Sequence, residues 1–266
     1  MLRGMLRGVW DCRQARARQA SKSKRLTLDG ADSVAHNPSG VDPTEEQWKK
    51  IADLCEAKKA IPIFDTAYQG YATGDLDKDA FSVRYFAHER GMELMVTQSY
   101  SKNFGLYGER IGALNVVCKD AASAVKIQSQ LGLIVRAMVS NPPLHGAQLV
   151  ATVIANDALY KQWDGELKMM SNRIVAMRTA LVEALKKIDC PTPNPIYSDW
   201  SHITSQIGMF AYTGLQAKHV KVLTDKYHIY CTANGRFSMA GVNPNNVGYI
   251  AEAMKDALTS AGPSDV

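Results

Sequence analysis

From residue 44 onward, short apolar runs alternate with stretches in which apolar residues recur at helical spacing. Thr44 and Gln47 have the spacing of a helix capping box, which predicts a helix that begins there and continues to Cys55. Residues 60–64 form a short apolar run that ends at Asp65, and this run predicts a buried strand.

The same alternation continues through the middle of the chain. A loop rich in glycine and tyrosine at 68–74 leads to a predicted helix at 79–90. Two further strands are predicted at 92–96 and 111–117. Short apolar strands that alternate with amphipathic helices are typical of an α/β domain, so we predict a mainly parallel sheet.

The C-terminal part has a different pattern. Residues 157–188 predict one long helix, because almost no helix breaker occurs until prolines follow at 191, 193 and 195. The remainder predicts a small α+β unit with strands at 207–212, 229–232 and 237–239 and helices at 217–227 and from residue 245. We therefore expect a basic, disordered segment at 1–30, a large domain at 31–165 and a small domain at 166–266, joined by the long helix.

The formal net charge of +5 comes from the N-terminal segment. Residues 1–30 hold six arginines and two lysines against Asp11 and Asp29, so this segment carries +6 and the other 236 residues carry −1. A nearly neutral body gives no support for binding nucleic acid. An arginine-rich segment almost free of acid is typical of a mitochondrial transit peptide, and equally of a disordered leader or a misassigned gene start. We predict a cytoplasmic protein, with a mitochondrial location as the alternative.

Composition narrows the class further. The 266 residues, 46% of them hydrophobic, suffice for one large core or two smaller ones. No apolar run approaches the roughly 20 residues of a membrane-spanning helix, so we expect no membrane partner. The five cysteines lack the spacing of a metal site, and their odd number rules out a complete disulfide framework. We expect a reducing compartment and no bound metal.

Lys102 carries the strongest chemical signal. It follows the apolar run at 92–96, lies between hydroxyl-bearing residues and precedes Arg110 by eight residues. A lysine at the end of a buried strand can form a Schiff base with a carbonyl cofactor, while hydroxyls and an arginine hold the phosphate of that cofactor. The alternative for Lys102 taken alone is a solvated surface lysine.

Several segments resemble one family in the right order. Residues 99–110 (SYSKNFGLYGER) resemble the cofactor-lysine motif of the aspartate aminotransferase family, which uses pyridoxal 5'-phosphate. Residues 64–70 (FDTAYQG) and 36–44 (HNPSGVDPT) are similar to two more of its segments. The resemblance covers about residues 35–258. It implies the pyridoxal-phosphate-dependent transferase fold type I.

The resemblance implies roles for three residues around the cofactor ring. Lys102 would form the Schiff base. Asp65 would keep the ring nitrogen protonated as a charge-assisted pair, at the strand end where open α/β sheets bind ligands. Tyr68 would donate to the ring hydroxyl oxygen. Taken alone, Asp65 is more typical of a turn or a helix N-cap.

Three more residues would complete the cofactor site of the family. Asn37 would bind the ring oxygen, while Ser99 and Arg110 would bind the phosphate, for which the planar arginine fork is suited. The alternatives are an ordinary Asn-Pro turn for Asn37 and a surface ion pair with Glu109 for Arg110.

The substrate residues implied by the resemblance lie further along the chain. Arg236, in the segment NGRFSMAG, would bind the α-carboxylate, and Phe210 would line the cleft. Arg136, shortly before Ser-Asn-Pro-Pro, would reach the neighbouring subunit's site and bind the side-chain carboxylate. The alternative for Arg136 is an ordinary residue of an amphipathic helix.

These roles imply a transaminase that converts aspartate and 2-oxoglutarate to oxaloacetate and glutamate, with Lys102 moving the substrate Cα proton. The expected partners are amino acids, 2-oxo acids and a second copy of the chain in the complete homodimer. Two alternatives stay open: an inactive fragment that acts only as a dimerisation partner, and an aminotransferase of aromatic amino acids.

Members of the family have a longer N-terminal portion before the Asn-Pro loop. It carries the first strands of the large domain, a helix N-terminus that seats the phosphate and an aromatic residue stacked on the cofactor ring. Residues 1–30 are too short and too polar to replace it. We therefore expect either an incomplete gene model of a normal enzyme or a truncated product that binds cofactor poorly.

Overall fold

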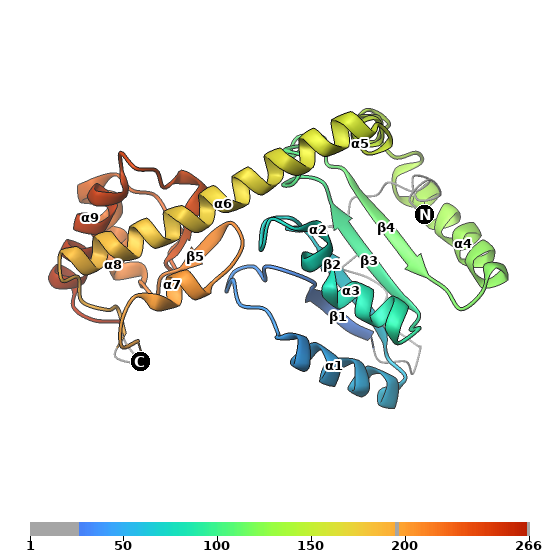
Figure 1. The fold of residues 1–266 in the computed structure, drawn as a ribbon, viewed down its shortest axis with the longest axis horizontal. Helices are drawn as coiled ribbons and strands as arrows, with labels where there is room; N and C mark the ends of the chain where they lie inside the picture. Colours follow the sequence, from blue (N-terminus) through green and yellow to red (C-terminus); the bar gives the residue numbers. More distant parts are fainter. Residues whose placement is uncertain (1–26, 195–196, 265–266) are drawn as a thin grey trace. The chain divides into compact units, whose positions relative to one another are not determined.

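The computed structural model describes residues 27–194 and 197–264, and its internal contacts divide them into two compact units (Figure 1). The first unit comprises residues 27–34, 42–70 and 75–167, and the second comprises 35–41, 71–74 and 168–264. The long helix α6 (Asp157–Lys187) contributes to both units and confirms the prediction at 157–188 to within one residue. The segments 35–41 and 71–74 belong to the second unit, although the sequence assigned them to the large domain.

The first unit is built on a four-stranded sheet. Its strands are β1 (Thr27–Asp32), β2 (Ile61–Thr66), β3 (Leu94–Ser99) and β4 (Gly112–Val117), in the order β1-β2-β3-β4. The first three strands are parallel, and β4 is antiparallel to β3, as the two neighbouring green arrows of Figure 1 show. The predicted, mainly parallel sheet is therefore present.

The strand β1 corrects the expected extent of the N-terminal segment. Thr27 and Leu28 pair with Ile61 and Pro62 of β2, so residues 27–30 belong to the sheet. Residues 1–26 lie outside the described part of the chain. The segment was predicted from its basic side chains, whereas strand pairing uses backbone hydrogen bonds, which every residue except proline can donate.

The helix α1 (Glu45–Lys58) begins at the predicted capping box. The Gln47 N–H donates to Thr44 Oγ1 at 3.3 Å, and the Thr44 N–H donates to Gln47 Oε1 at 2.8 Å. One face of this helix buries Trp48 against Phe64 of β2 and Phe86, and the three rings are 5.1–6.1 Å apart. These contacts form the core of the first unit.

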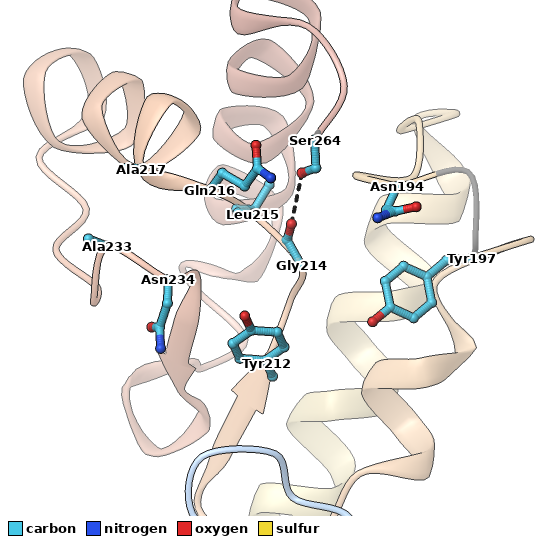
Figure 2. A pocket seen from close by; sticks show the side chains of 10 residues that line it. All are labelled: Asn194, Tyr197, Tyr212, Gly214, Leu215, Gln216, Ala217, Ala233, Asn234 and Ser264. Atoms are coloured by element: carbon cyan, nitrogen blue, oxygen red, sulfur yellow. Dashed lines mark hydrogen bonds between the residues drawn. The ribbon is translucent and has the colours of Figure 1, made fainter. Parts of the chain in front are cut away.

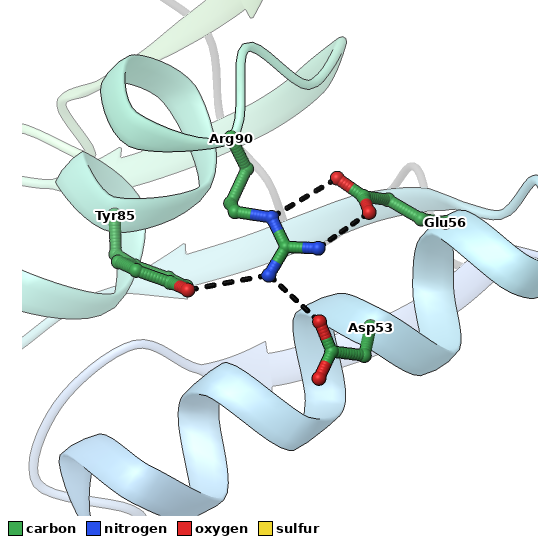
Figure 3. Close-up of polar contacts among 4 residues, drawn as sticks. All are labelled: Asp53, Glu56, Tyr85 and Arg90. Carbon is green, nitrogen blue, oxygen red and sulfur yellow. Dashed lines mark hydrogen bonds and ion pairs between the residues drawn. The ribbon is translucent and has the colours of Figure 1, made fainter.

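The predicted helix at 79–90 is divided into three short pieces. They are α2 (Leu76–Asp79), α3 (Phe81–Arg84) and the π-helical turn η3 (Tyr85–Glu89). Arg90 ends this segment and ties it to α1 (Figure 3): it bonds both oxygens of Glu56, at 3.1 and 2.5 Å, and donates to Asp53 at 2.7 Å and to the Tyr85 hydroxyl at 3.2 Å. The two carboxylates raise the pKa of Arg90, first through its hydrogen bonds with Glu56.

Two helices of the first unit were not predicted. They are α4 (Ala121–Val139) and α5 (His145–Ala155). In the described part of the chain α4 has no buried residue. Several of its exposed side chains are apolar: Val125, Leu133, Ile134, Met138 and Val139. None of the described helices is both long and apolar enough to cross a membrane.

The second unit contains the C-terminal part of α6, a two-stranded antiparallel sheet and shorter helices. The sheet pairs β5 (Phe210–Tyr212) with β6 (Arg236–Ser238). The helices are α7 (Ser201–Ser205), α8 (Ala217–Tyr227), the 3-10 turn η4 (Met239–Gly241) and α9 (Val247–Ala261). The helix α8 has the predicted bounds, and β5 is shorter than the predicted strand at 207–212.

The predicted strand at 229–232 is wrong. The Ile229 N–H donates to the Leu223 carbonyl at 3.0 Å, just beyond the C-terminal end of α8, and the Thr232 N–H donates to the Arg236 carbonyl at 3.4 Å. These two N–H groups bond to the end of a helix and within a turn instead of to a neighbouring strand, so residues 229–232 lie in a loop.

Candidate active site

Two of the predicted site residues lie at the same edge of the sheet. Asp65 is the penultimate residue of β2 and pairs with Thr97 of β3, and Ser99 is the last residue of β3. Because β2 and β3 are parallel, their C-terminal ends meet at one edge, which is where open α/β sheets bind ligands. Tyr68 follows β2 and is 6% exposed.

The structure brings Lys102 and Tyr68 together. The Lys102 Nζ lies 4.9 Å from the centroid of the Tyr68 ring, a cation–π distance. Lys102 is half-buried in a turn that the Gly105 N–H closes by donating to the Lys102 carbonyl at 3.1 Å. An amine is thus held next to a phenol at the carboxyl edge of the sheet.

The two residues predicted to bind phosphate flank this turn. Ser99 Oγ accepts a hydrogen bond from the Ser101 N–H at 3.2 Å. Arg110 is exposed, and its guanidinium donates to the Tyr107 carbonyl at 3.0 Å. The phosphate contacts of both residues stay predictions.

Buried hydrogen bonds that the sequence did not reveal hold the main chain at Asp65 and the neighbouring Thr66. The Ser33 N–H donates to the Asp65 carbonyl at 3.0 Å, and Ser33 Oγ lies 2.7 Å from Thr66 Oγ1. Ser82 Oγ donates to the Ser33 carbonyl at 3.0 Å. Ser33, Thr66 and Ser82 are each at most 4% exposed. No motif marks them, because they come from segments between 16 and 49 residues apart.

Three predicted residues meet in the second unit. The Arg236 Nη1 donates to Asn37 Oδ1 at 2.7 Å, and the Arg236 Cζ lies 4.6 Å from the centroid of the Phe210 ring. Arg236 is the first residue of β6 and pairs with Tyr212 of β5. The guanidinium is therefore fixed on one side by an amide oxygen and on one face by an aromatic ring.

Asn37 is placed by the contacts that its loop makes within the second unit. The Ile207 N–H donates to the Gly40 carbonyl at 2.8 Å. Gly40 has φ +65°, and a Cβ at this position would lie 2.9 Å from the Ile207 carbonyl oxygen, so only glycine fits. The Asn37–Pro38 peptide bond is cis.

Arg136 lies on α4, a helix that carries none of the other predicted site residues. It is exposed near the C-terminal end of α4, and its Nη1 donates to Ser140 Oγ at 2.5 Å. Its predicted role in a neighbouring subunit stays a prediction.

The second unit also has a surface hollow of about 360 Å³ (Figure 2). Tyr212 and Asn234 face it from one side and Tyr197 and Asn194 from the other. Of the described residues that line this hollow, none is a predicted site residue.

The cysteines in the described part of the chain form no disulfide bond. Cys55, Cys118, Cys190 and Cys231 are free thiols. Burial raises the pKa of Cys190 to about 12 and that of Cys231 to about 11, so both stay protonated at neutral pH. Within residues 27–194 and 197–264, no three His, Cys, Asp or Glu side chains are grouped closely enough to hold a metal ion.

Comparison with known proteins identifies the family. Residues 33–254 match the family model described as aminotransferase class I and II. The chain therefore belongs to the class I and II aminotransferases.

Among its relatives, the mitochondrial aspartate aminotransferase of Arabidopsis thaliana is 52% identical over 229 residues, which are 86% of this chain and 52% of that protein. The solved cytoplasmic aspartate aminotransferase from Giardia lamblia is 41% identical, with a TM-score of 0.86 over 92% of this chain and 59% of that one. The aromatic-amino-acid aminotransferase from Burkholderia pseudomallei, solved covalently bound to pyridoxal phosphate, is 38% identical, with a TM-score of 0.80 over 86% and 55%.

These matches confirm the predicted family and fold class. This chain spans about half the length of the curated relatives it matches. Because the relatives above include a mitochondrial and a cytoplasmic protein, the compartment of this chain stays a prediction.

Proposed function

We propose that this chain is part of a pyridoxal-phosphate-dependent aspartate aminotransferase. The observation that carries the proposal is the amine of Lys102, held over the Tyr68 ring at the sheet edge that also carries Asp65. Aspartate aminotransferases about half identical to the chain over most of its length support the same activity.

The donor set of the first unit fits pyridoxal phosphate. When bound, this cofactor supplies an electron-accepting ring that weakens the Cα–H bond of an amino acid. Lys102 would hold the cofactor through its Nζ, and the Tyr68 hydroxyl would donate to the ring oxygen. Asp65 would hold the ring nitrogen in its protonated form, and Ser99 and Arg110 would hold the phosphate.

Lys102 would also move the proton. A half-buried amine next to a phenol can take the proton from the Cα of the amino acid as general base and return it as general acid. This role requires the amine to change partners, which the flexible lysine stem allows.

Arg236 would bind the α-carboxylate of the substrate. Its guanidinium presents five N–H donors in a rigid plane. One is held by Asn37 Oδ1 and one face by Phe210, which orients the remaining fork before substrate arrives. An oriented fork loses less conformational entropy when it binds a carboxylate.

Arg136 would select dicarboxylates from across a homodimer. The exposed apolar side chains of α4, among them Leu133 and Ile134, support a second copy of the chain as the partner of this helix. Arg136 follows Leu133 by three residues, a spacing that places both side chains on one side of the helix, so Arg136 would enter the other copy's site with that surface.

Labelling of Lys102 tests the proposed cofactor. The protein is mixed with pyridoxal phosphate, reduced with borohydride and digested, and the labelled lysine is identified by mass spectrometry. We expect one label at Lys102, which Lys102→Ala abolishes and Lys119→Ala, at an exposed lysine, does not. Labels spread evenly over exposed lysines would instead support the alternative of an inactive fragment that only dimerises.

Replacing Arg136 tests the substrate. A hydrogen bond to a charged group contributes about 1.5–3 kcal/mol, so Arg136→Gln should lower kcat/KM for aspartate by about 10- to 150-fold. The value for phenylalanine should change less than about threefold, as should both values in Lys126→Gln on the same helix. Equal losses for both amino acids would remove the proposed role of Arg136. A larger kcat/KM for phenylalanine than for aspartate in the unsubstituted protein would favour the aromatic alternative, to which the similarity to the Burkholderia enzyme points.

A further inference from the structure

The turn that carries Lys102 continues directly from the pairing of β3 with β4. The Tyr100 N–H donates to the Ile111 carbonyl at 3.1 Å, just before β4. Residues 101–104 then form a turn without regular structure. The pairing of Ser99 with Gly112 anchors both ends of this loop, so a further contact along residues 101–104 can fix where the lysine amine lies.

The helix α6 makes such a contact through Trp163. The Trp163 Nε1–H donates to the Asn103 carbonyl at 2.8 Å. The Trp163 ring also stacks on Phe104, with centroids 4.5 Å apart and planes 21° from parallel, and Phe104 meets Tyr100 edge-on at 5.4 Å. One side chain therefore fixes the two residues that directly follow Lys102.

The side-chain oxygen of Asn103 does not fix the turn. Asn103 is 3% exposed, and its Oδ1 has no hydrogen-bond partner among the described residues. Its main-chain carbonyl, by contrast, accepts from an indole N–H, a group that can only donate. The main-chain bond to Trp163 is thus a polar contact that joins this turn to α6.

We propose that Trp163 is a positioning residue for Lys102. It holds the main chain on the C-terminal side of the lysine, so that the Nζ stays over the Tyr68 ring. Small displacements of a reacting group cost large factors in rate, and catalytic side chains need a supporting layer of locked neighbours. The inference rests on the proposed function, because Lys102 matters through the cofactor it would hold.

Trp200 offers a matched control. Its Nε1–H also donates to a main-chain carbonyl, that of Cys190, at 3.1 Å, and Trp200 is 2% exposed in the second unit. Trp163→Phe and Trp200→Phe remove the same kind of hydrogen bond and keep an aromatic ring. If the loss of an indole hydrogen bond affects Lys102 only by destabilising the protein as a whole, the effect should therefore appear in both variants.

The first measurement needs no cofactor. Lysine amines are labelled briefly with acetic anhydride, and the rate at Lys102 is compared with the rate at exposed lysines such as Lys49. In the unsubstituted protein the half-buried Lys102 should react slowly. Trp163→Phe should raise its relative rate at least about threefold, and Trp200→Phe should leave it unchanged. Phe104→Leu, which removes the stacking but keeps the indole bond, serves as a second variant and should also raise the rate.

The second measurement uses pyridoxal phosphate and borohydride. Trp163→Phe should slow the labelling of Lys102 by about tenfold, and Trp200→Phe should not. If Trp163→Phe and Phe104→Leu both fold and leave the anhydride rate at Lys102 unchanged, the role of Trp163 is overturned. If the unsubstituted protein takes no pyridoxal phosphate label, the proposed function fails, and the anhydride rates still decide whether Trp163 positions the amine.

Discussion

Replacing Arg178 with alanine is expected to lower the free energy of unfolding of the second unit by at least about 3 kcal/mol. Arg178, on α6, is 2% exposed and donates to three carbonyls: those of Ile203 at 2.9 Å, Gly208 at 2.9 Å and Phe210 at 2.5 Å. Each buried carbonyl that loses its donor costs about 1–3 kcal/mol. Burial lowers the pKa of Arg178 to about 10, so its guanidinium remains charged at neutral pH.

Hydrogen exchange of the main-chain amides in residues 203–212 would measure this loss. A change of 3 kcal/mol corresponds to an exchange rate on the order of 10²-fold faster, because each 1.4 kcal/mol is a factor of ten. Arg173→Ala is the control, since Arg173 also donates to carbonyls from α6, those of Ala240 and Val242, but is exposed. Exchange in Arg178→Ala within threefold of that in Arg173→Ala would contradict the prediction.

The loss would extend to the substrate residues of the same unit. The Phe210 carbonyl is held by Arg178, and the Phe210 ring lies under the Arg236 guanidinium. We therefore expect Arg178→Ala to weaken the orientation of Arg236 through Phe210.

Elements governed by local chemistry were predictable from the sequence. The capping box of Thr44 and Gln47 marks the start of α1, and the absence of breakers marks α6. The helix α4 was missed because its apolar side chains, such as Val125 and Leu133, are not confined to a buried stripe. The direction of β4 depends on pairing with β3, which the residues of β4 alone do not specify.

In the candidate site, too, residues within motifs were predictable and contacts between distant segments were not. Lys102 and Arg236 stand in motifs that sequence reasoning could find. Their supporting contacts were not visible, because Arg236 meets Asn37 across 199 positions and Trp163 meets Asn103 across 60. Such contacts arise only when elements pack, and a donor such as Trp163 looks in the sequence like any apolar helix residue.

Replacing Gly235 with alanine should have the second large effect, because this glycine places Arg236. Gly235 has φ +77°, and a Cβ there would lie 2.3 Å from the Leu215 carbonyl oxygen and 2.9 Å from the Leu215 nitrogen. The Gly235 carbonyl also accepts from the N–H and the hydroxyl of the buried Thr213, at 3.1 and 2.7 Å. Since main chain meets main chain at this point, the overlap can be relieved only by moving the residues that lead into β6.

We expect Gly235→Ala to destabilise the second unit by about 2–5 kcal/mol, from about 1–2 kcal/mol for the left-handed conformation and about 1–3 kcal/mol for the overlap. Gly91→Ala is the control, since Gly91 has φ +61° but open space where its Cβ would lie, so only the conformational cost should remain. In protein loaded with pyridoxal phosphate, Gly235→Ala should also weaken binding of a dicarboxylate without an amino group by about tenfold, as the displaced Arg236 fork no longer faces the carboxylate. Urea unfolding and a binding titration check the two effects, and a Gly235→Ala protein as stable as Gly91→Ala would show that the Leu215 contact relaxes without moving β6.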